Sequence, residues 1–313
     1  MDLGQFSNPN SVDMLSALTG ATELMKAERI KGKAKGGTVF GGLVELQDVG
    51  RLAIIGDLHG DFNCLAAIVQ EVSKERFFDD PANKMVFLGD YVDRGPNSAG
   101  VLAAVCNLKV RYAESILMMR GNHEAPSEFP FSSHDFPFEL IRTFAEDEGR
   151  NIYRKSLLLF RELTLATIVA GKIMLVHGGL PTEDHSKNYR KEVADARENF
   201  MHSRVLEEIL WNDPREIVGM PGWEWSDRGL GRYFGPDITR RWLTATGTAC
   251  VVRGHEPCRG YKIDHGGRVM TIFSSHEPYP SFDAAYISAS HEELLNLRDA
   301  EDLVPLVKYP VLG

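Results

Sequence analysis

LAIIGDLHGD, residues 52–61, is a short apolar run that ends directly in a cluster of polar side chains. The same arrangement occurs twice more along the chain, in MVFLGDYVDRG (85–95) and SILMMRGNHE (115–124). Amphipathic stretches near residues 62–73 and 97–107 separate the three runs, which predicts a βαβαβ order with buried, parallel strands. Right-handed crossovers would bring the polar clusters to one sheet edge, where ligands usually bind in α/β proteins.

The second half of the chain predicts a further sheet. The segment LTLATIVAGKIMLVHGG (163–179) reads as a hairpin that turns at residues 170–172. Three more apolar runs predict short strands of this second sheet: ACVVRGHE (249–256), RVMTIFSS (268–275) and AAYISAS (284–290). A helix-rich insert near 187–212 and a glycine- and tryptophan-rich loop over 212–236 interrupt them. Ser290 and Glu293 fit a capping box that opens a final helix.

Composition and charge place the chain among ordinary globular proteins, with 43% apolar residues, 25% charged residues and a net charge of −9. We expect a polar, helical N-terminal extension over residues 1–36 and a single catalytic domain over 37–313. The basic run at 26–35 is interpreted as a solvated helix face, and the acidic balance predicts no nucleic-acid partner. Since the chain has no membrane-length apolar run and no secretory start, we expect no membrane contact and a cytoplasmic location. The four cysteines lack a CxxC pair and are expected to be buried thiols.

The polar clusters supply ligands of the kind that bind metal ions. A lone Asp or Asn after a strand is usually a turn residue or helix cap, but carboxylates gathered at neighbouring strand tips repel one another unless a cation lies between them. Oxygen and nitrogen donors without thiolate suit manganese, and also iron or zinc. Six ligands are too many for one open catalytic ion and predict two divalent ions with a bridging carboxylate. The candidate ligands are Asp57, His59, Asp90, Asn122, His177 and His255.

Arginines accompany these clusters and predict an anionic ligand. Arg94 and Arg228 are the candidates for binding phosphate oxygens, because a guanidinium group can contact two oxygens at once. Arg120 and Arg253 also lie beside the ligand motifs, although any single arginine is more often an ordinary surface charge.

GDLHG, GDYVDRG and GNHE, in this order, resemble the three motifs of the PPP family of metal-dependent serine/threonine protein phosphatases. The resemblance covers residues 51–283 and includes four later blocks: HGGL (177–180), LWNDP (210–214), SDRGLGRYFG (226–235) and RGHE (253–256). It implies a metallophosphoesterase-like α/β fold, with a central sandwich of two mixed β-sheets flanked by α-helices. The DRGPNS run (93–98) is similar to prokaryotic-type members.

The resemblance also implies roles for the candidate residues. Asp57, His59 and Asp90 would bind the first ion, whereas Asp90, with residues 122, 177 and 255, would bind the second. His123, oriented by Asp93, would protonate the leaving alkoxide, and Arg94 and Arg228 would bind the phosphate. The implied reaction is hydrolysis of phosphoserine or phosphothreonine in proteins by a bridging metal-bound hydroxide. The implied substrates are phosphoproteins, and the sequence does not identify a regulatory subunit.

Several features leave alternatives open. Without the resemblance, His123 reads equally well as a residue that orients Asn122. The phenylalanine-rich segment within 129–144 is interpreted as packing against helices, with a substrate wall as the alternative, and Tyr279 is a weak site candidate. Trp223 and Trp225 fit either a substrate cleft or plain packing.

Two other functions remain alternatives to the phosphoprotein phosphatase. Hydrolysis of symmetric dinucleoside polyphosphates is the alternative reaction, although those relatives tend to carry GNHD where this chain has GNHE. A binding scaffold without catalysis is disfavoured because all six candidate ligands are present.

Overall fold

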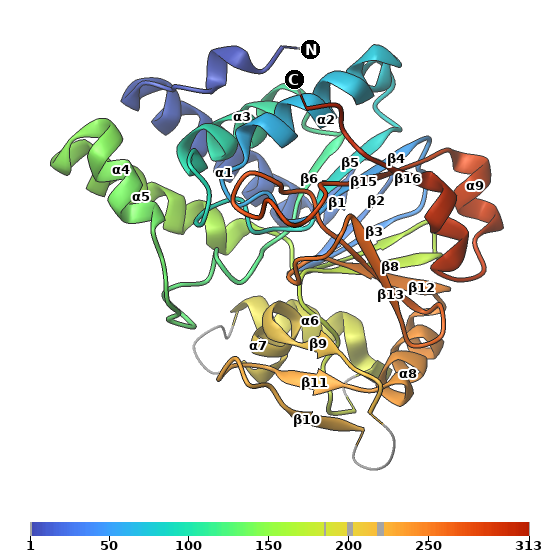
Figure 1. Cartoon of the computed structure of the whole chain (residues 1–313). Helices are drawn as coiled ribbons and strands as arrows, with labels where there is room; N and C mark the ends of the chain where they lie inside the picture. Colours follow the sequence, from blue (N-terminus) through green and yellow to red (C-terminus); the bar gives the residue numbers. More distant parts are fainter. Residues whose placement is uncertain (1, 185, 199–202, 218–221, 313) are drawn as a thin grey trace.

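Two β-sheets pack face to face at the centre of the molecule, with helices on both outer sides (Figure 1). The computed structural model describes residues 2–184, 186–198, 203–217 and 222–312. Parts of the expected helical insert and of the expected loop, residues 199–202 and 218–221, lie outside the described residues. The layered arrangement confirms the predicted sandwich of two mixed sheets flanked by α-helices.

The smaller central sheet contains the three strands that precede the polar clusters. Its strands, in spatial order, are β16 (Val307–Lys308), β15 (Tyr286–Ala289), β4 (Leu52–Ile55), β5 (Lys84–Phe87) and β6 (Ile116–Met118). Strands β4, β5 and β6 are parallel, as predicted. The prediction that β15 belongs to the second sheet is wrong, because it pairs antiparallel with β4. A short, continuous apolar run indicates that a strand is buried on both faces, but it does not indicate which strand it pairs with.

The larger central sheet is also mixed. Its strands, in spatial order, are β1 (Lys33–Ala34), β2 (Gly37–Phe40), β3 (Leu43–Leu46), β7 (Ala166–Val169), β8 (Ile173–Val176), β12 (Cys250–Arg253), β14 (Val269–Ile272) and β13 (Tyr261–Asp264). Strands β7 and β8 form the predicted antiparallel hairpin, whereas β8, β12 and β14 are parallel. The carboxyl ends of β8 and β12 therefore point in one direction.

The segment expected to be a loop over 212–236 contains a third, small sheet, which corrects that prediction. Its strands, in spatial order, are β10 (Trp223–Trp225), β11 (Arg232–Phe234) and β9 (Asp213–Pro214). Strands of two or three residues are too short to show an alternating pattern, so the glycines and prolines around them dominate the sequence signal.

Helices cover the outer faces of both central sheets. Their bounds are α1 (Ser11–Lys31), α2 (Phe62–Lys74), α3 (Ser98–Arg111), α4 (Phe136–Phe144), α5 (Glu146–Glu162), α6 (Tyr189–Glu198), α7 (Arg204–Trp211), α8 (Pro236–Thr246) and α9 (His291–Asn296). Helices α1 to α5 pack in the core beside the smaller sheet, and α6 to α8 cover the larger one (Figure 1). Helices α2 and α3 match the predicted amphipathic stretches, and α9 begins with the predicted capping box at Ser290 and Glu293. No helix in the described part of the chain combines the length and apolarity that crossing a bilayer requires.

Helix α1 is part of the packed core rather than a loose appendage. Met14, Leu18 and Ala21 on one side of it are fully buried with α3 and α5. Arg29, from the basic run, forms an ion pair with Glu162 at the end of α5. The division into an extension over 1–36 and a domain over 37–313 stays a prediction.

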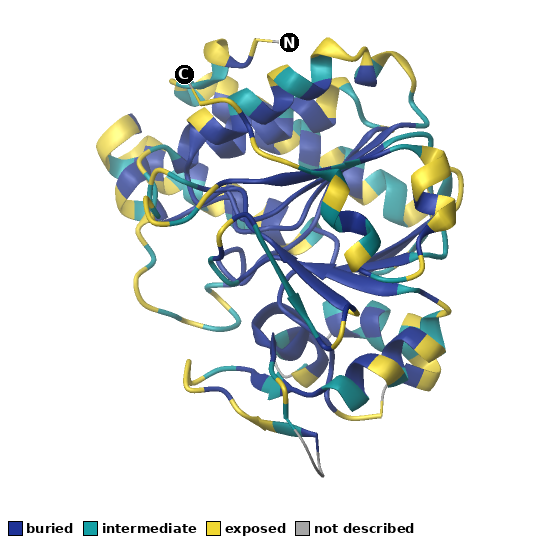
Figure 2. Cartoon of the chain, turned by 45° about the vertical axis from the view of Figure 1, so that its right-hand side comes forward, coloured by how far each residue is buried: buried dark blue, intermediate teal, exposed yellow. Residues whose placement is uncertain are grey.

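The core is divided by the smaller sheet. Along β4, Leu52 and Ile54 face the other sheet, whereas Ala53 and Ile55 face the helices. Figure 2 shows the inner strands of the sandwich buried, the edge strand β13 partly buried and the helices exposed on their outer sides. All four cysteines are free and buried, as predicted. This rigid sandwich fixes the positions of the loops at its strand ends.

Candidate active site

The carboxyl ends of strands from both central sheets converge on one site. Asp57 follows β4, Asp90 follows β5 and Asn122 follows β6 in the smaller sheet. His177 follows β8 and His255 follows β12 in the larger sheet. The structure therefore brings together predicted ligands that are far apart in the sequence. The His255 backbone N–H donates to Asp57 Oδ1 at 2.9 Å, although the two residues are 198 positions apart.

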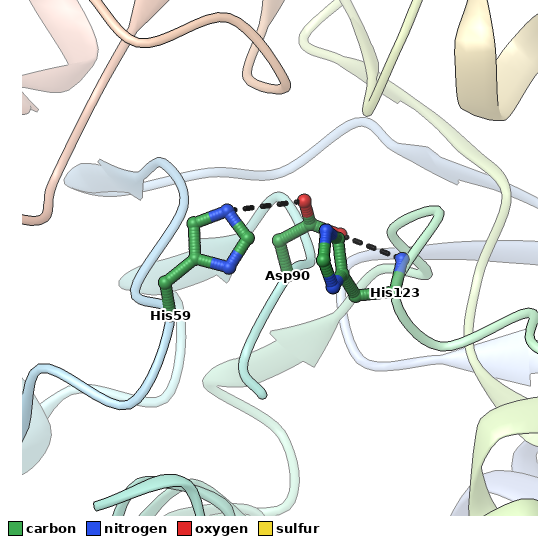
Figure 3. A group of neighbouring side chains, drawn as sticks. All are labelled: His59, Asp90 and His123. Atoms are coloured by element: carbon green, nitrogen blue, oxygen red, sulfur yellow. Dashed lines mark hydrogen bonds and ion pairs between the residues drawn. The ribbon is translucent and has the colours of Figure 1, made fainter. Parts of the chain in front are cut away.

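Asp90 lies at the centre of the site and belongs to two groups of potential metal ligands. One group is His59, Asp90 and His123, and the other is Asp90, His177 and His255; all five residues are buried. Figure 3 shows His59 and His123 on either side of the Asp90 carboxylate. Asp90 Oδ2 lies 3.5 Å from His59 Nε2, and Asp90 Oδ1 lies 3.4 Å from His177 Nε2. One carboxylate oxygen thus faces each group.

The remaining candidate ligands complete these groups. Asp57 Oδ2 lies 3.8 Å from His59 Nε2 and is buried without a hydrogen-bond partner. Asn122 Oδ1 lies 3.0 Å from His177 Nε2 and 2.9 Å from His255 Nδ1. A buried carboxylate oxygen without a partner is costly in a folded protein, and a bound cation would remove that cost.

Burial and mutual repulsion perturb the ionisation of these groups. Burial, together with the nearby Asp90 carboxylate, raises the pKa of Asp57 to about 6. Burial lowers the pKa of His59 to about 4. Burial would also lower the pKa of His177, but the Asp90 carboxylate outweighs it and raises that pKa to about 9. Carboxylate and carboxamide oxygens together with imidazole nitrogens form a donor set that fits two divalent ions of the manganese, iron or zinc type.

Strained backbone holds the ligands in place. His59, Asp90 and His255 adopt the left-handed region, with φ angles of 45°, 52° and 68°. Side chains other than glycine rarely adopt this conformation, and it is concentrated at functional sites. Gly254 allows the close approach of the two sheets, because a Cβ atom at this position would lie 2.3 Å from Asp57 Oδ1.

His123 and Asp93 form a buried pair beside the ligands. His123 Nδ1 lies 2.7 Å from Asp93 Oδ2, and the His123 backbone N–H donates to Asp90 Oδ1 at 3.0 Å. Burial would lower the pKa of His123, but the carboxylates of Asp90 and Asp93 outweigh burial and raise it. Burial would raise the pKa of Asp93, but hydrogen bonds from His123 and His134 hold it well below its ordinary value. His123 is thus suited to carry a proton near neutral pH.

A cleft of about 670 Å³ opens above these groups. Its lining combines ligands, arginines and apolar side chains: His59, Asp90, Arg94, Asn122, His123, Pro130, Phe131, Ser132, Trp211, Arg228, Gly229, Leu230, His255, Pro257 and Tyr279. Both predicted phosphate-binding arginines are among them. Arg228 Nε donates to Asp213 Oδ2 at 2.9 Å, which leaves its terminal nitrogens available to an anion. Arg94 Nη1 lies 3.3 Å from Ser133 Oγ.

The other arginines and tryptophans raised by the sequence have structural contacts. Arg120 is buried and donates to Glu128 Oε1 at 2.8 Å, and Arg253 is fully buried and donates to Asp213 Oδ1 at 2.8 Å. Trp223 and Trp225 stack around Arg232, with its guanidinium carbon 3.8 Å and 4.9 Å from the two ring centroids, away from the cleft lining.

Sequence reasoning missed several residues of the cleft. Phe131 lines it and also packs against buried core residues, so the two interpretations of the phenylalanine-rich segment both apply at this position. Trp211 also lines it, and its ring centroid lies 5.7 Å from that of His255. Tyr279, considered a weak candidate, lies in the cleft with its ring centroid 5.6 Å from that of His59. Asp213, which accepts a hydrogen bond from Arg228, lies fifteen residues before it, and its place in the LWNDP block was the only signal in the sequence that could have found it.

The chain belongs to the calcineurin-like phosphoesterase family, because the family model matches residues 50–259, more than half of its length. Members of this family depend on a pair of metal ions. The match confirms the family resemblance of the three ordered motifs.

Individual relatives are named serine/threonine phosphatases. The chain is 33% identical to a probable serine/threonine-protein phosphatase of Encephalitozoon cuniculi over 75% of this chain and 49% of that protein. It is 29% identical to serine/threonine-protein phosphatase 7 of Arabidopsis thaliana over 77% of this chain and 67% of that protein. The chain therefore spans about half the length of the first relative and two thirds of the second.

A solved structure shares the fold. It is a protein serine/threonine phosphatase from Saccharomyces cerevisiae with similarity to human phosphatase PP5, with a TM-score of 0.72 and 23% sequence identity. The match covers 97% of this chain and 91% of that chain. At this identity the similarity supports the metallophosphoesterase fold.

Proposed function

We propose that the protein hydrolyses phosphoserine and phosphothreonine in proteins with the help of two divalent metal ions. The observation that carries the proposal is the floor of the cleft, where two ligand groups share the Asp90 carboxylate below Arg94 and Arg228. The names of the two sequence relatives support the substrate class.

The ligands would divide between two ions that share Asp90. Asp57 and His59 would complete the first site, and Asn122, His177 and His255 would complete the second. When bound, such a pair of ions supplies a water nucleophile at neutral pH and polarises a phosphoryl oxygen. We propose manganese as the preferred ion, since each site contains oxygen ligands, from Asp90 and from Asp57 or Asn122, and neither contains a thiolate.

The arginines would bind and orient the phosphate. Asp213 accepts a hydrogen bond from Arg228 Nε, which leaves the two terminal nitrogens of Arg228 for an anion, and Arg94 lines the same cleft. Guanidinium groups contact phosphate oxygens in pairs, so both would hold the ester in one orientation and offset negative charge that develops on its oxygens. Phe131, Trp211 and Leu230 provide apolar walls that limit water around the bound ester.

His123 would supply the proton that the leaving group needs. Its Nδ1 atom is held by Asp93, so its Nε2 atom remains to donate a proton to the departing serine or threonine oxygen. The carboxylates around it raise its pKa, which favours the protonated form. Asp93 orients the ring and stabilises its charge without itself taking the proton.

A direct comparison of substrates tests the proposal. Metal-free protein is loaded with Mn²⁺, its bound metal is counted, and turnover is measured with phosphoserine and phosphothreonine peptides and with diadenosine tetraphosphate. We expect two ions per chain and turnover of the phosphopeptides only. Turnover of diadenosine tetraphosphate alone would favour the dinucleoside reaction, and no turnover by protein with two bound ions would favour a binding role.

A further inference from the structure

The Asp93 carboxylate is shared by two imidazoles. Its Oδ2 atom lies 2.7 Å from His123 Nδ1 and 2.9 Å from His134 Nδ1. Its Oδ1 atom accepts the backbone N–H groups of Asp135 and Phe136, both at 2.7 Å. Asp93 itself is fully buried. The segment that follows GNHE therefore supplies three of the four hydrogen bonds to this carboxylate.

The hydrogen bonds of His134 indicate which of its ring nitrogens donates and which accepts. An ionised carboxylate only accepts hydrogen bonds, so His134 must donate from Nδ1 to Asp93. Its Nε2 atom lies 2.9 Å from the hydroxyl of Tyr153 on α5, and a neutral ring that donates from Nδ1 accepts at Nε2 from this hydroxyl. Both ring nitrogens of a neutral His134 are thereby satisfied, with Tyr153 fixing the tautomer that donates to Asp93.

The location of His134 connects it to the cleft without placing it there. Phe131 lies between the two imidazoles, with its ring centroid 4.4 Å from that of His123 and 5.4 Å from that of His134. Phe131 and Ser132 line the cleft, whereas His134 is partly buried behind them. Its hydrogen bond to Asp93 is therefore the polar connection between His134 and His123.

We infer that His134, held by Tyr153, is a positioning residue that aligns the Asp93 carboxylate on His123. The inference rests on the proposed function, in which His123 donates the proton to the leaving oxygen. Without His134, Asp93 would keep its backbone hydrogen bonds but lose a donor at the oxygen that contacts His123. The carboxylate could then rotate, and His123 would spend less time in the orientation that the reaction requires.

Leaving-group dependence tests this role. A phosphoserine peptide has a basic leaving oxygen that needs a proton, whereas the p-nitrophenolate of p-nitrophenyl phosphate leaves without one. In Mn²⁺-loaded protein, His134→Leu is expected to lower kcat for the peptide by about 10- to 100-fold and for the aryl phosphate by no more than about threefold, with KM nearly unchanged. His134→Asn should restore most of the loss, since its amide nitrogen can donate from the position of Nδ1.

Two further variants separate the proposed role of His134 from a general loss of protein stability. Tyr153→Phe removes only the hydroxyl and is expected to lower kcat for the peptide by about two- to fivefold, with the same substrate pattern. His291→Leu is the control: His291, at the start of α9, donates to the Val49 carbonyl oxygen and is not among the residues that line the cleft, so this variant should leave both activities unchanged. Bound metal should stay at the wild-type level in every variant.

Three results would overturn the inference while leaving the proposed function intact: wild-type activity in His134→Leu, equal losses on both substrates, or His134→Asn no better than His134→Leu. Loss of bound metal in His134→Leu would likewise overturn it, because the residue would then support the ligands. A wild-type protein that carries two ions and turns over neither substrate would instead overturn the proposed function itself.

Discussion

Replacing Asp90 with Asn should damage both metal sites at once. The substitution keeps the shape of the side chain and removes one negative charge from a fully enclosed position. Asp90 is the only residue common to the two ligand groups found among the described residues, with one oxygen 3.5 Å from His59 Nε2 and the other 3.4 Å from His177 Nε2. Each ion would therefore lose a charged ligand.

The expected magnitude follows from this double role. An interaction with a buried charged group contributes about 1.5 to 3 kcal/mol, so two of them contribute about 3 to 6 kcal/mol. At about 1.4 kcal/mol per factor of ten, the combined affinity for two Mn²⁺ ions should fall by about 10²- to 10⁴-fold. Asp57 belongs to one site only, so Asp57→Asn should cost about 10- to 100-fold and affect a single ion.

The assay compares the two variants in the same buffer. Each protein is stripped with a chelator and titrated with Mn²⁺ by calorimetry, and bound metal is then counted by mass spectrometry. We expect Asp90→Asn to weaken both binding events and Asp57→Asn to weaken one. Circular dichroism confirms that each variant is folded before it is compared.

Equal losses of Mn²⁺ affinity in Asp90→Asn and Asp57→Asn would refute the bridging role of Asp90. So would an Asp90→Asn protein that retains one ion with wild-type affinity, because the carboxylate would then serve a single site.

Three further predictions concern neighbouring residues. In metal-free protein, Asp57→Asn should raise the free energy of unfolding at pH 7 by on the order of 3 kcal/mol, because the pKa of Asp57 is about 6 in the folded chain against an ordinary 3.8. The free energy of unfolding of the wild-type protein should fall by this amount as the pH rises from about 4 to 6, because the raised pKa disfavours ionised Asp57 in the folded chain. The free energies of unfolding of the two proteins, measured with urea, should therefore agree near pH 4 and diverge above it. A difference that does not change with pH would contradict the raised pKa. Gly254→Ala should weaken Mn²⁺ binding about tenfold, since the new Cβ would meet Asp57 Oδ1, and calorimetry showing wild-type affinity would contradict this close approach. Arg228→Lys should raise the KM of a phosphopeptide about tenfold, because an ammonium group cannot bind Asp213 and two phosphate oxygens together; an unchanged KM would place the phosphate elsewhere.

The parallel strands around the ligand motifs could be predicted from the sequence because their signal is local. Each apolar run of β4, β5 and β6 ends in glycine or arginine followed by polar residues, and crossover chirality then specifies the common edge. The convergence of Asp57, Asp90 and Asn122 follows from that topology alone.

Pairing between distant strands could not be predicted in the same way. Strand β15 pairs with β4 across more than 200 residues, in a register that joins Tyr286 to Ile55. The apolar pattern of β15 would suit either sheet, since both of its faces are buried in either place. Small strands such as β10 carry too few residues for a period to appear.

The residues of the cleft walls come together through tertiary packing and could therefore be predicted only in part from the sequence. Phe131 and Trp211 come from separate segments, and although Trp211 lies in the LWNDP block, an apolar ring in a sequence does not reveal whether it lines a cleft or packs in the core. His134 was not considered as a candidate, because its role depends on a hydrogen bond to Asp93 that no spacing in the sequence reveals. Arg94 and Arg228, by contrast, could be predicted from the sequence because each lies within a motif that also carries acidic residues.

Anomalous diffraction from Mn²⁺-loaded crystals tests the central claim most directly. We expect two manganese peaks in the floor of the cleft, both in contact with the Asp90 carboxylate, one also bound by Asp57 and His59 and the other by Asn122, His177 and His255. A single peak, or two peaks of which only one contacts Asp90, would contradict a metal pair organised around this carboxylate.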